Sequence, residues 1–143
     1  MTTLQTMYAP QANSPSTTTT GAMTTGQTTV NVLDASVLPD APNLLVFGAD
    51  KNSPETVFMT DKDGNTLTIQ RAFQGVAQSW PGSTLVGRYF TAKDLSTVQE
   101  NIQTLNADKV DEDDLATVAT SGSYGDLEGV PESFTPSSHT HTK

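Results

Sequence analysis

The stretch "ETVFMTDKDGNTLTIQRAF" (residues 55–73) carries the strongest local structural signal in the sequence. On both sides of its centre, apolar residues alternate with polar ones, at Val57, Met59, Leu67 and Ile69. Alternation with a period of two is typical of strands that have one buried face. The central Asp63-Gly64 pair supplies the positive φ that a tight turn requires. The stretch therefore predicts a β-hairpin.

The loop "DKDGN" (61–65) also raises the alternative of a calcium site. A calcium loop of the EF-hand type places oxygen ligands at alternate positions and a Glu at position twelve. Counted from Asp61, position twelve is Ala72. The pattern favours a hairpin turn over a calcium loop.

Three further stretches around the hairpin predict strands. "TTVNVLD" (28–34) alternates, "NLLVFGAD" (43–50) is a short apolar run suited to a buried strand, and "STLVGRYF" (83–90) follows a Trp-Pro-Gly turn. Together they predict a mainly β protein with a small β-sandwich or barrel-like domain over residues 30–90. Within it we expect Glu55 and Arg71 to form a structural ion pair, and Trp80 to act as a core or rim anchor.

Residues 91–107, "TAKDLSTVQENIQTLNA", change to a helical pattern. Their large apolar residues are spaced 3, 4 and 3 apart, at Leu95, Val98, Ile102 and Leu105. This narrow stripe is typical of a coiled-coil seam, and a helix packed against the β-domain is the alternative. Thr91 and Asp94 form a capping box, which marks the start of the helix.

The two ends of the chain have an open composition. Residues 1–29 are rich in Thr, Ser, Pro and Gly, so they are either a disordered tail or an extended arm that docks on a partner. The anchors of such an arm would be Leu4, Met7 and Tyr8. Residues 108–143 have too few large apolar side chains to bury a core within one chain, and they suit an extended stalk in which several copies wind together.

Charge and composition argue against several classes of function. With 143 residues, the chain has a net charge of −9 and only 7 scattered Lys and Arg residues, which argues against binding nucleic acid or anionic membranes. The sequence has no cysteine, no visible secretion signal and no stretch apolar enough to span a membrane. It also lacks an interpretable catalytic triad or acid–base pair, so we expect no enzyme activity.

Several segments resemble a known family. "ATSGSYGDLEGVPESF" (119–134) is similar to a segment that recurs in the shafts of phage tail fibres, and "SSHTHTK" resembles their His-x-His segment. The stretch from residue 48 to residue 94 resembles the N-terminal β-domain of tail-fibre and baseplate-attached proteins. Matching positions include Glu55, Arg71, Arg88 and Asp94, whereas Ala72 stands where the family often has Gly.

The resemblance implies a structural virion protein. It would be the attachment region of a homotrimeric tail fibre, bound to baseplate or tail proteins through its N-terminal region and to the host surface receptor only indirectly. Such a protein would assemble in the host cytoplasm, be released by lysis, and belong to a phage tail or a phage-derived particle. The alternative is a carbohydrate-binding β-module of a surface or tail adhesin.

The only two histidines, His139 and His141, lie two residues apart near the end of the sequence. In an extended segment, such residues point to the same side. Around a three-fold axis they would present six imidazoles, an octahedral set that suits Fe(II), Co(II) or Ni(II), with one metal ion per trimer. A frayed end or a tag remnant is the alternative.

Overall fold

A computed structural model describes residues 3–110, 112–116, 119, 121–123, 125, 129 and 140–143. The chain divides into two compact units, Met1–Thr104 and Leu105–Lys143. The regular elements in chain order are β1 (Ser16–Thr18), β2 (Thr29–Asn31), the 3-10 turn η1 (Ala35–Val37), β3 (Asn43–Phe47), β4 (Glu55–Asp63), β5 (Thr66–Gln74), β6 (Leu85–Gly87), α1 (Ala92–Asp108) and the 3-10 turn η2 (Glu112–Asp114).

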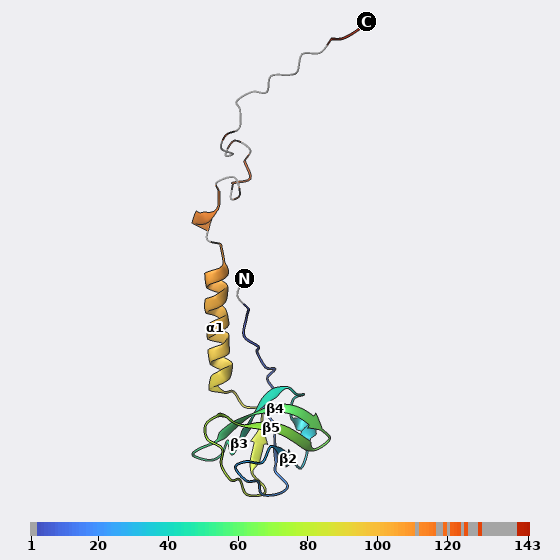
Figure 1. The fold of residues 1–143 in the computed structure, drawn as a ribbon, viewed down its shortest axis with the longest axis vertical. Helices are drawn as coiled ribbons and strands as arrows, with labels where there is room; N and C mark the ends of the chain where they lie inside the picture. Colours follow the sequence, from blue (N-terminus) through green and yellow to red (C-terminus); the bar gives the residue numbers. More distant parts are fainter. Residues whose placement is uncertain are drawn as a thin grey trace. The chain divides into compact units, whose positions relative to one another are not determined.

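The six strands form one antiparallel sheet in the order β1-β6-β3-β4-β5-β2. The sheet curls until its two edges meet (Figure 1). Thr19 and Val32 pair across that junction, and the N–H of Leu33 donates to the carbonyl of Thr18 at 2.9 Å. The prediction of a mainly β protein is confirmed, and its domain is a single curled, barrel-like sheet.

The hairpin predicted from residues 55–73 is β4 and β5. Asp63 pairs with Thr66, so the connection is Gly64-Asn65, and Gly64 has a φ of 57°. The Asn65 side chain accepts a hydrogen bond from the N–H of Ala35 at 2.9 Å. This loop therefore ties the hairpin to η1, which is the turn role that the sequence favoured.

The interior of the curled sheet is apolar. It contains every alternating residue that the sequence analysis placed on a buried face, together with residues from the connecting loops: Met23, Val30, Val32, Ala35, Leu38, Leu45, Phe47, Val57, Met59, Leu67, Ile69, Trp80 and Val86. Burial of a Val, Leu, Ile, Phe or Met side chain contributes about 1.5–3 kcal/mol. β3 is buried on both faces, as its continuous apolar run predicted.

One charged group lies among these apolar side chains. The carboxylate of Glu55 has no exposed surface and accepts hydrogen bonds from Arg71 Nε at 2.9 Å and Arg71 Nη2 at 2.8 Å. Trp80 Nε1 donates to the same carboxylate at 3.0 Å, and so do the N–H groups of Ala72 and Gln78. The expected Glu55–Arg71 ion pair is therefore confirmed, and Trp80 is a core residue.

A bulge in β5 makes this arrangement possible. The pairing of β4 with β5 slips between Thr56 and Phe58, so that residues 71–73 lie opposite one residue of β4. Ala72 takes a left-handed φ of 50° at this point, which turns its N–H towards Glu55. Gly adopts such a φ without strain, so an alanine at this position is conformationally costly.

The predicted boundary at residue 29 is wrong. β1 pairs with β6 over Ser16–Thr18, and Met23 lies in the core. The buried Thr17 and Thr19 hydroxyls accept the N–H groups of Asp34 and Thr84 at 3.0 Å each. A threonine strand can close the sheet through backbone pairing and short polar side chains, so it needs few large apolar residues.

Gly48 allows the Trp80 ring to pack against the backbone. Its φ is 68°, and an added Cβ would lie 2.5 Å from two ring carbons of Trp80. Because the ring is anchored to Glu55 through Nε1, it cannot move aside without losing that bond. The close approach explains why a residue without a side chain follows β3.

Gly48→Ala is expected to lower the free energy of unfolding by about 2–4 kcal/mol, the sum of a left-handed alanine and an overpacked core. Chemical denaturation followed by Trp80 fluorescence measures the loss. Gly64→Ala is the matched control, because Gly64 also has a left-handed φ but no atom near its Cβ position, so only about 1 kcal/mol should be lost. Equal losses in the two variants would contradict the packing argument.

Candidate functional site

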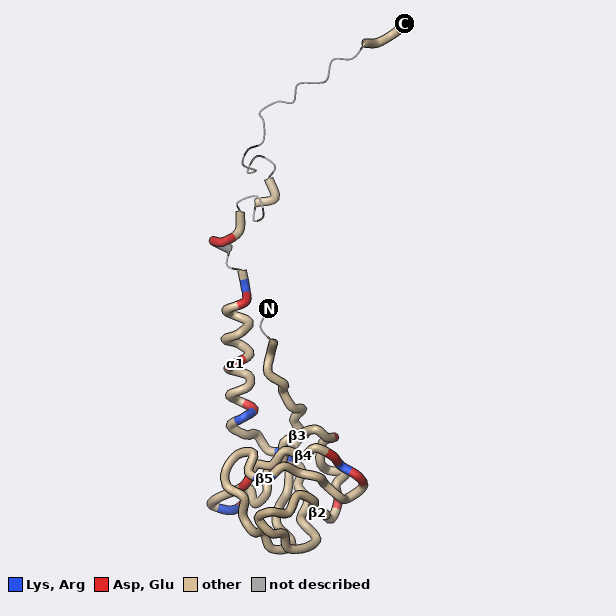
Figure 2. The backbone as a smooth tube through the Cα atoms, in the orientation of Figure 1, with Lys and Arg blue, Asp and Glu red and all other residues tan. Residues whose placement is uncertain are grey.

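The candidate site lies where the N-terminal segment meets α1. Residues 3–12, which we call the arm, run alongside the helix (Figure 1). The arm contains no charged residue, and between Asp94 and Asp108 the helix carries only Glu100 (Figure 2). The arm and α1 therefore form a surface of low charge in a protein whose net charge is −9. No helix among the described residues is long and apolar enough to cross a membrane.

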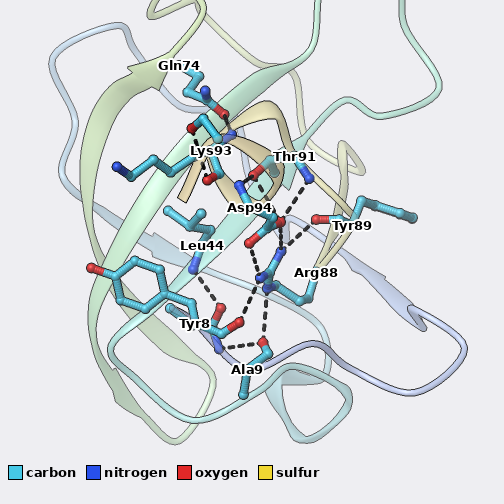
Figure 3. A network of polar contacts seen from close by, with 11 residues as sticks. Tyr8, Ala9, Leu44, Gln74, Arg88, Tyr89, Thr91, Lys93 and Asp94 are labelled. Carbon is cyan, nitrogen blue, oxygen red and sulfur yellow. Dashed lines mark hydrogen bonds and ion pairs between the residues drawn. The ribbon is translucent and has the colours of Figure 1, made fainter. Parts of the chain in front are cut away.

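The buried guanidinium of Arg88 joins the arm to the helix (Figure 3). It forms a two-pronged ion pair with Asp94, with distances of 2.8 Å from Nη1 and 2.7 Å from Nη2. It also donates to the carbonyls of Ala9 at 3.1 Å, Tyr8 at 3.2 Å and Tyr89 at 2.7 Å. All five N–H donors of Arg88 are thus used, and two of them hold the arm backbone.

Asp94 also caps the helix, as the sequence predicted. Its Oδ2 accepts the N–H of Thr91 at 2.9 Å, and its own N–H donates to Thr91 Oγ1 at 3.3 Å. This reciprocal pair is the capping box. Because one carboxylate serves both the cap and Arg88, the start of the helix and the position of the arm are linked.

Two asparagine side chains hold the arm at other points. Asn101, which is buried on α1, accepts the N–H of Gln5 at 2.7 Å and donates to the carbonyl of Gln5 at 3.0 Å. Asn43 Nδ2 donates to the carbonyl of Ala9 at 3.0 Å. All of these polar contacts to the arm thus go to its backbone atoms. The sheet and the helix recognise the extended course of the arm rather than its polar side chains.

Tyr8 supplies the side-chain anchor. Its ring lies 5.4 Å from that of Phe58 on β4, and Phe58 stacks on Phe73 at 5.7 Å. Such aromatic pairs contribute about 0.5–1.5 kcal/mol beyond the area they bury. Leu4 and Met7 remain largely exposed. Of the three predicted anchors, Tyr8 is therefore used within its own chain, whereas Leu4 and Met7 keep much of their surface free, although Met7 also lines the cavity described next.

A cavity of about 450 Å³ lies between the arm and the first turns of α1, lined mainly by apolar surface. Its lining includes Met7, Tyr89, Phe90 and Val98. The hydroxyl of Thr97, on the same wall, is buried and has no hydrogen-bond partner among the described residues. The arm therefore does not fill the groove that it covers.

The predicted apolar stripe of α1 lies uncovered. Its four residues are exposed by 40–59% of their surface: Leu95, Val98, Ile102 and Leu105. The helix instead uses Thr97 and Asn101, the two buried residues of α1, to face the arm. The alternative of a helix packed through its stripe on the β-domain is thus not what the structure shows.

The predicted metal ligands are not seen together. His139 lies outside the described residues, and His141 lies in the described range 140–143. Among the described residues, no group of three or more His, Cys, Asp or Glu side chains could hold a metal ion. The predicted stalk over residues 108–143 also falls largely outside the described part of the chain. The metal site and the stalk both stay predictions.

Sequence reasoning missed the residues that hold the arm. The sequence marks Arg88 only through the resemblance to tail fibres, and it gives Asn43 and Asn101 no role. One signal was available: Asp94, Thr97 and Asn101 are spaced 3 and 4 apart, which places a second, polar stripe on α1. A polar stripe beside an apolar one indicates that two faces of a helix meet different partners.

No protein-family model matches the sequence, and the search among curated proteins found no match.

Acid is expected to destabilise the fold through Glu55 and Asp94. Burial by itself raises the pKa of each carboxyl, but hydrogen bonds from Arg71 and Arg88 and from backbone N–H groups outweigh it, so each pKa lies below its ordinary value. The unfolded chain then binds protons more readily than the folded one. The stabilisation is therefore complete above about pH 5 and is lost as the pH falls below about 4.

Urea denaturation between pH 3 and pH 7 measures this dependence. Asp94→Asn should flatten the acid limb of the curve, because it removes one of the two titrating groups. A free energy of unfolding that rises on acidification below pH 4.5 would contradict the assignment of these two carboxylates.

Proposed function

We propose that this chain is the attachment region of a homotrimeric fibre, which anchors the fibre to the tail or baseplate of a phage or phage-like particle for adsorption to the host. The resemblance of residues 30–143 to tail-fibre segments supports this proposal. The observation that carries it is the uncovered apolar stripe on α1. A stripe with spacings of 3 and 4 suits a three-helix seam better than solvent.

The exposed side chains of the arm support the attachment role. Leu4 and Met7 are exposed while the backbone of the arm is held by Arg88 and Asn101. An extended segment that is fixed through its backbone presents its free side chains in a defined order. A tail or baseplate protein with apolar pockets would take these two side chains, at little further cost in ordering the arm.

Trp80 bears on the alternative function of binding a carbohydrate. As the only tryptophan it would be the strongest sugar platform, but it is buried in the core and bonded to Glu55. Three other aromatic rings pack against one another, Tyr8 on Phe58 and Phe58 on Phe73. These observations favour the attachment role.

The proposed trimer would also complete the His139 and His141 pair. Three chains would bring six imidazoles to one axis, and one Fe(II) or another octahedral divalent ion would bind there. Binding requires neutral imidazoles, so the affinity for the metal should fall on acidification.

The mass of the purified protein in solution tests the proposal. Light scattering or native mass spectrometry should find three chains, and the trimer should persist with a chelator because the α1 seam does not depend on the metal. Elemental analysis should find about one metal ion per three chains. A monomer at micromolar concentration would overturn the proposed function, whereas a trimer without metal would overturn only the histidine site.

A further inference from the structure

The turn at the base of the arm holds a strained conformation. The N–H of Ser14 donates to the carbonyl of Gln11 at 3.0 Å, which closes a turn just before β1. Within it, Asn13 has a φ of 62° and Ser14 has a φ of 44°. Two successive residues with a side chain in the left-handed region are unfavourable, and Asn tolerates it better than Ser.

The next residue adds to this strain. Pro15 follows Ser14, and the ring of a proline disfavours helical backbone angles in the residue before it while favouring an extended one. The sequence at this point therefore prefers to continue straight. The bend that returns the arm to its own helix is imposed by the contacts of the arm.

Those contacts do not depend on which copy supplies the arm. Arg88, Asn43 and Asn101 contact the arm only through its backbone groups, at Gln5, Tyr8 and Ala9. Tyr8 adds one aromatic contact with Phe58. A second copy of this chain carries the same extended segment with a tyrosine at the same place, so its arm would satisfy every one of these groups.

We propose that, in the assembled trimer, each arm leaves its own chain and lies on α1 and the outer sheet face of a neighbouring copy. Asn13 and Ser14 then take extended angles, which removes the strain of the turn. This inference rests on the proposed trimer. Exchange of an identical segment between copies makes the same contacts in a new place and adds a link between chains.

The reach of the hinge permits this exchange. Helices packed on a shared seam lie about 8–10 Å apart. Residues 10–15, once extended, span up to about 20 Å. The arm-facing residues Thr97 and Asn101 lie one position before the stripe residues Val98 and Ile102, which places the arm groove about 100° around the helix from the seam. The groove of a neighbouring copy is therefore close enough to receive the arm.

The absence of native cysteine makes the exchange directly measurable. Gln5→Cys and Asn101→Cys in one chain, joined by a short bis-maleimide, should give covalently linked trimers on a denaturing gel. If each arm lay on its own chain, the same protein would give only monomers with an internal link. Because Asn101→Cys removes two hydrogen bonds to the arm, a second pair, Tyr8→Cys with Phe58→Cys, repeats the test with Asn101 and Arg88 intact.

Mixing two singly substituted proteins distinguishes a link between chains from a link within one chain without relying on gel mobility. Gln5→Cys and Asn101→Cys chains, unfolded and refolded together, should form a linked pair containing one chain of each kind. Its absence from a protein that is trimeric by mass would overturn the exchange and leave the proposed function standing. A monomeric mass before linking would overturn the proposed function, and the exchange with it.

Variants of the hinge test the cause. Asn13→Pro fixes φ near −65°, which the returning turn cannot accept, so the linked trimer should become the sole product. Glycine at both Asn13 and Ser14 removes the strain of the turn, so the fraction linked between chains should fall by roughly tenfold. An unchanged product ratio in both variants would overturn the role of the hinge.

Discussion

Ile102→Asp is expected to convert a trimeric protein into monomers. In the proposed seam, Ile102 meets its equivalents from two other copies, and each buried Ile side chain contributes about 1.5–3 kcal/mol. Because only the exposed 59% of each Ile102 becomes buried in the seam, three copies lose roughly 3–5 kcal/mol of burial. Three carboxylates in one layer would add an unpaired cluster of charge at the axis. At micromolar concentration this loss exceeds what a short helical seam can absorb.

The structure of the single chain makes the result interpretable. Ile102 is 59% exposed, so the substitution should leave the fold of the single chain intact. The denaturation midpoint of the monomer should therefore be essentially unchanged. Gln103→Asp is the matched control, since it adds the same charge at the next position, on an exposed part of α1 outside the stripe. Light scattering on both variants measures the outcome. An Ile102→Asp protein that stays trimeric would show that the stripe packs elsewhere.

Glu55→Ala is expected to remove about 3–5 kcal/mol of stability, because it leaves the Arg71 guanidinium buried without its carboxylate. The N–H groups of Trp80, Ala72 and Gln78 would lose their acceptor at the same time. A domain of this size has only about 5–15 kcal/mol in total. The variant should therefore be close to unfolding at room temperature.

Chemical denaturation with Trp80 fluorescence measures this loss. Glu55→Gln should lose less stability than Glu55→Ala, because the amide keeps one oxygen acceptor. Some stability is still lost, because the NH₂ group of the amide faces donors that need an acceptor. Glu100→Ala, at an exposed position of α1, is the control and should change stability by less than about 0.5 kcal/mol. A loss below about 1 kcal/mol in Glu55→Ala would contradict a structural role for the buried pair.

The arm and the helix are linked through one carboxylate. Asp94 caps α1 and at the same time fixes Arg88, which holds the carbonyls of Tyr8 and Ala9. The groove for the arm is thus complete only when α1 has formed behind its cap at Thr91. In the proposed trimer, the arm groove of a neighbouring copy is therefore available only after α1 has formed, so exchange of the arms would follow formation of the α1 seam.

The local features of the fold were predictable from the sequence because neighbouring residues determine them. The alternation at Val57 and Met59 and the positive φ of Gly64 in the turn require only strand periodicity and backbone freedom. The same is true of the helix and of the Thr91 and Asp94 cap, whose hydrogen bonds span three residues. The Glu55 and Arg71 pair followed from the hairpin, which brings the two strands together.

Tertiary structure alone decided the rest, since it depends on contacts between residues far apart in the chain. The composition of β1 is typical of a flexible segment, and the segment becomes a strand because it pairs with β6. The arm has no core residues of its own, and it becomes ordered because Arg88 and Asn101, some 80 and 96 positions away, meet its backbone. Every residue has a backbone carbonyl and every residue except proline has a backbone N–H, so a sequence cannot indicate which of them a distant side chain will bind.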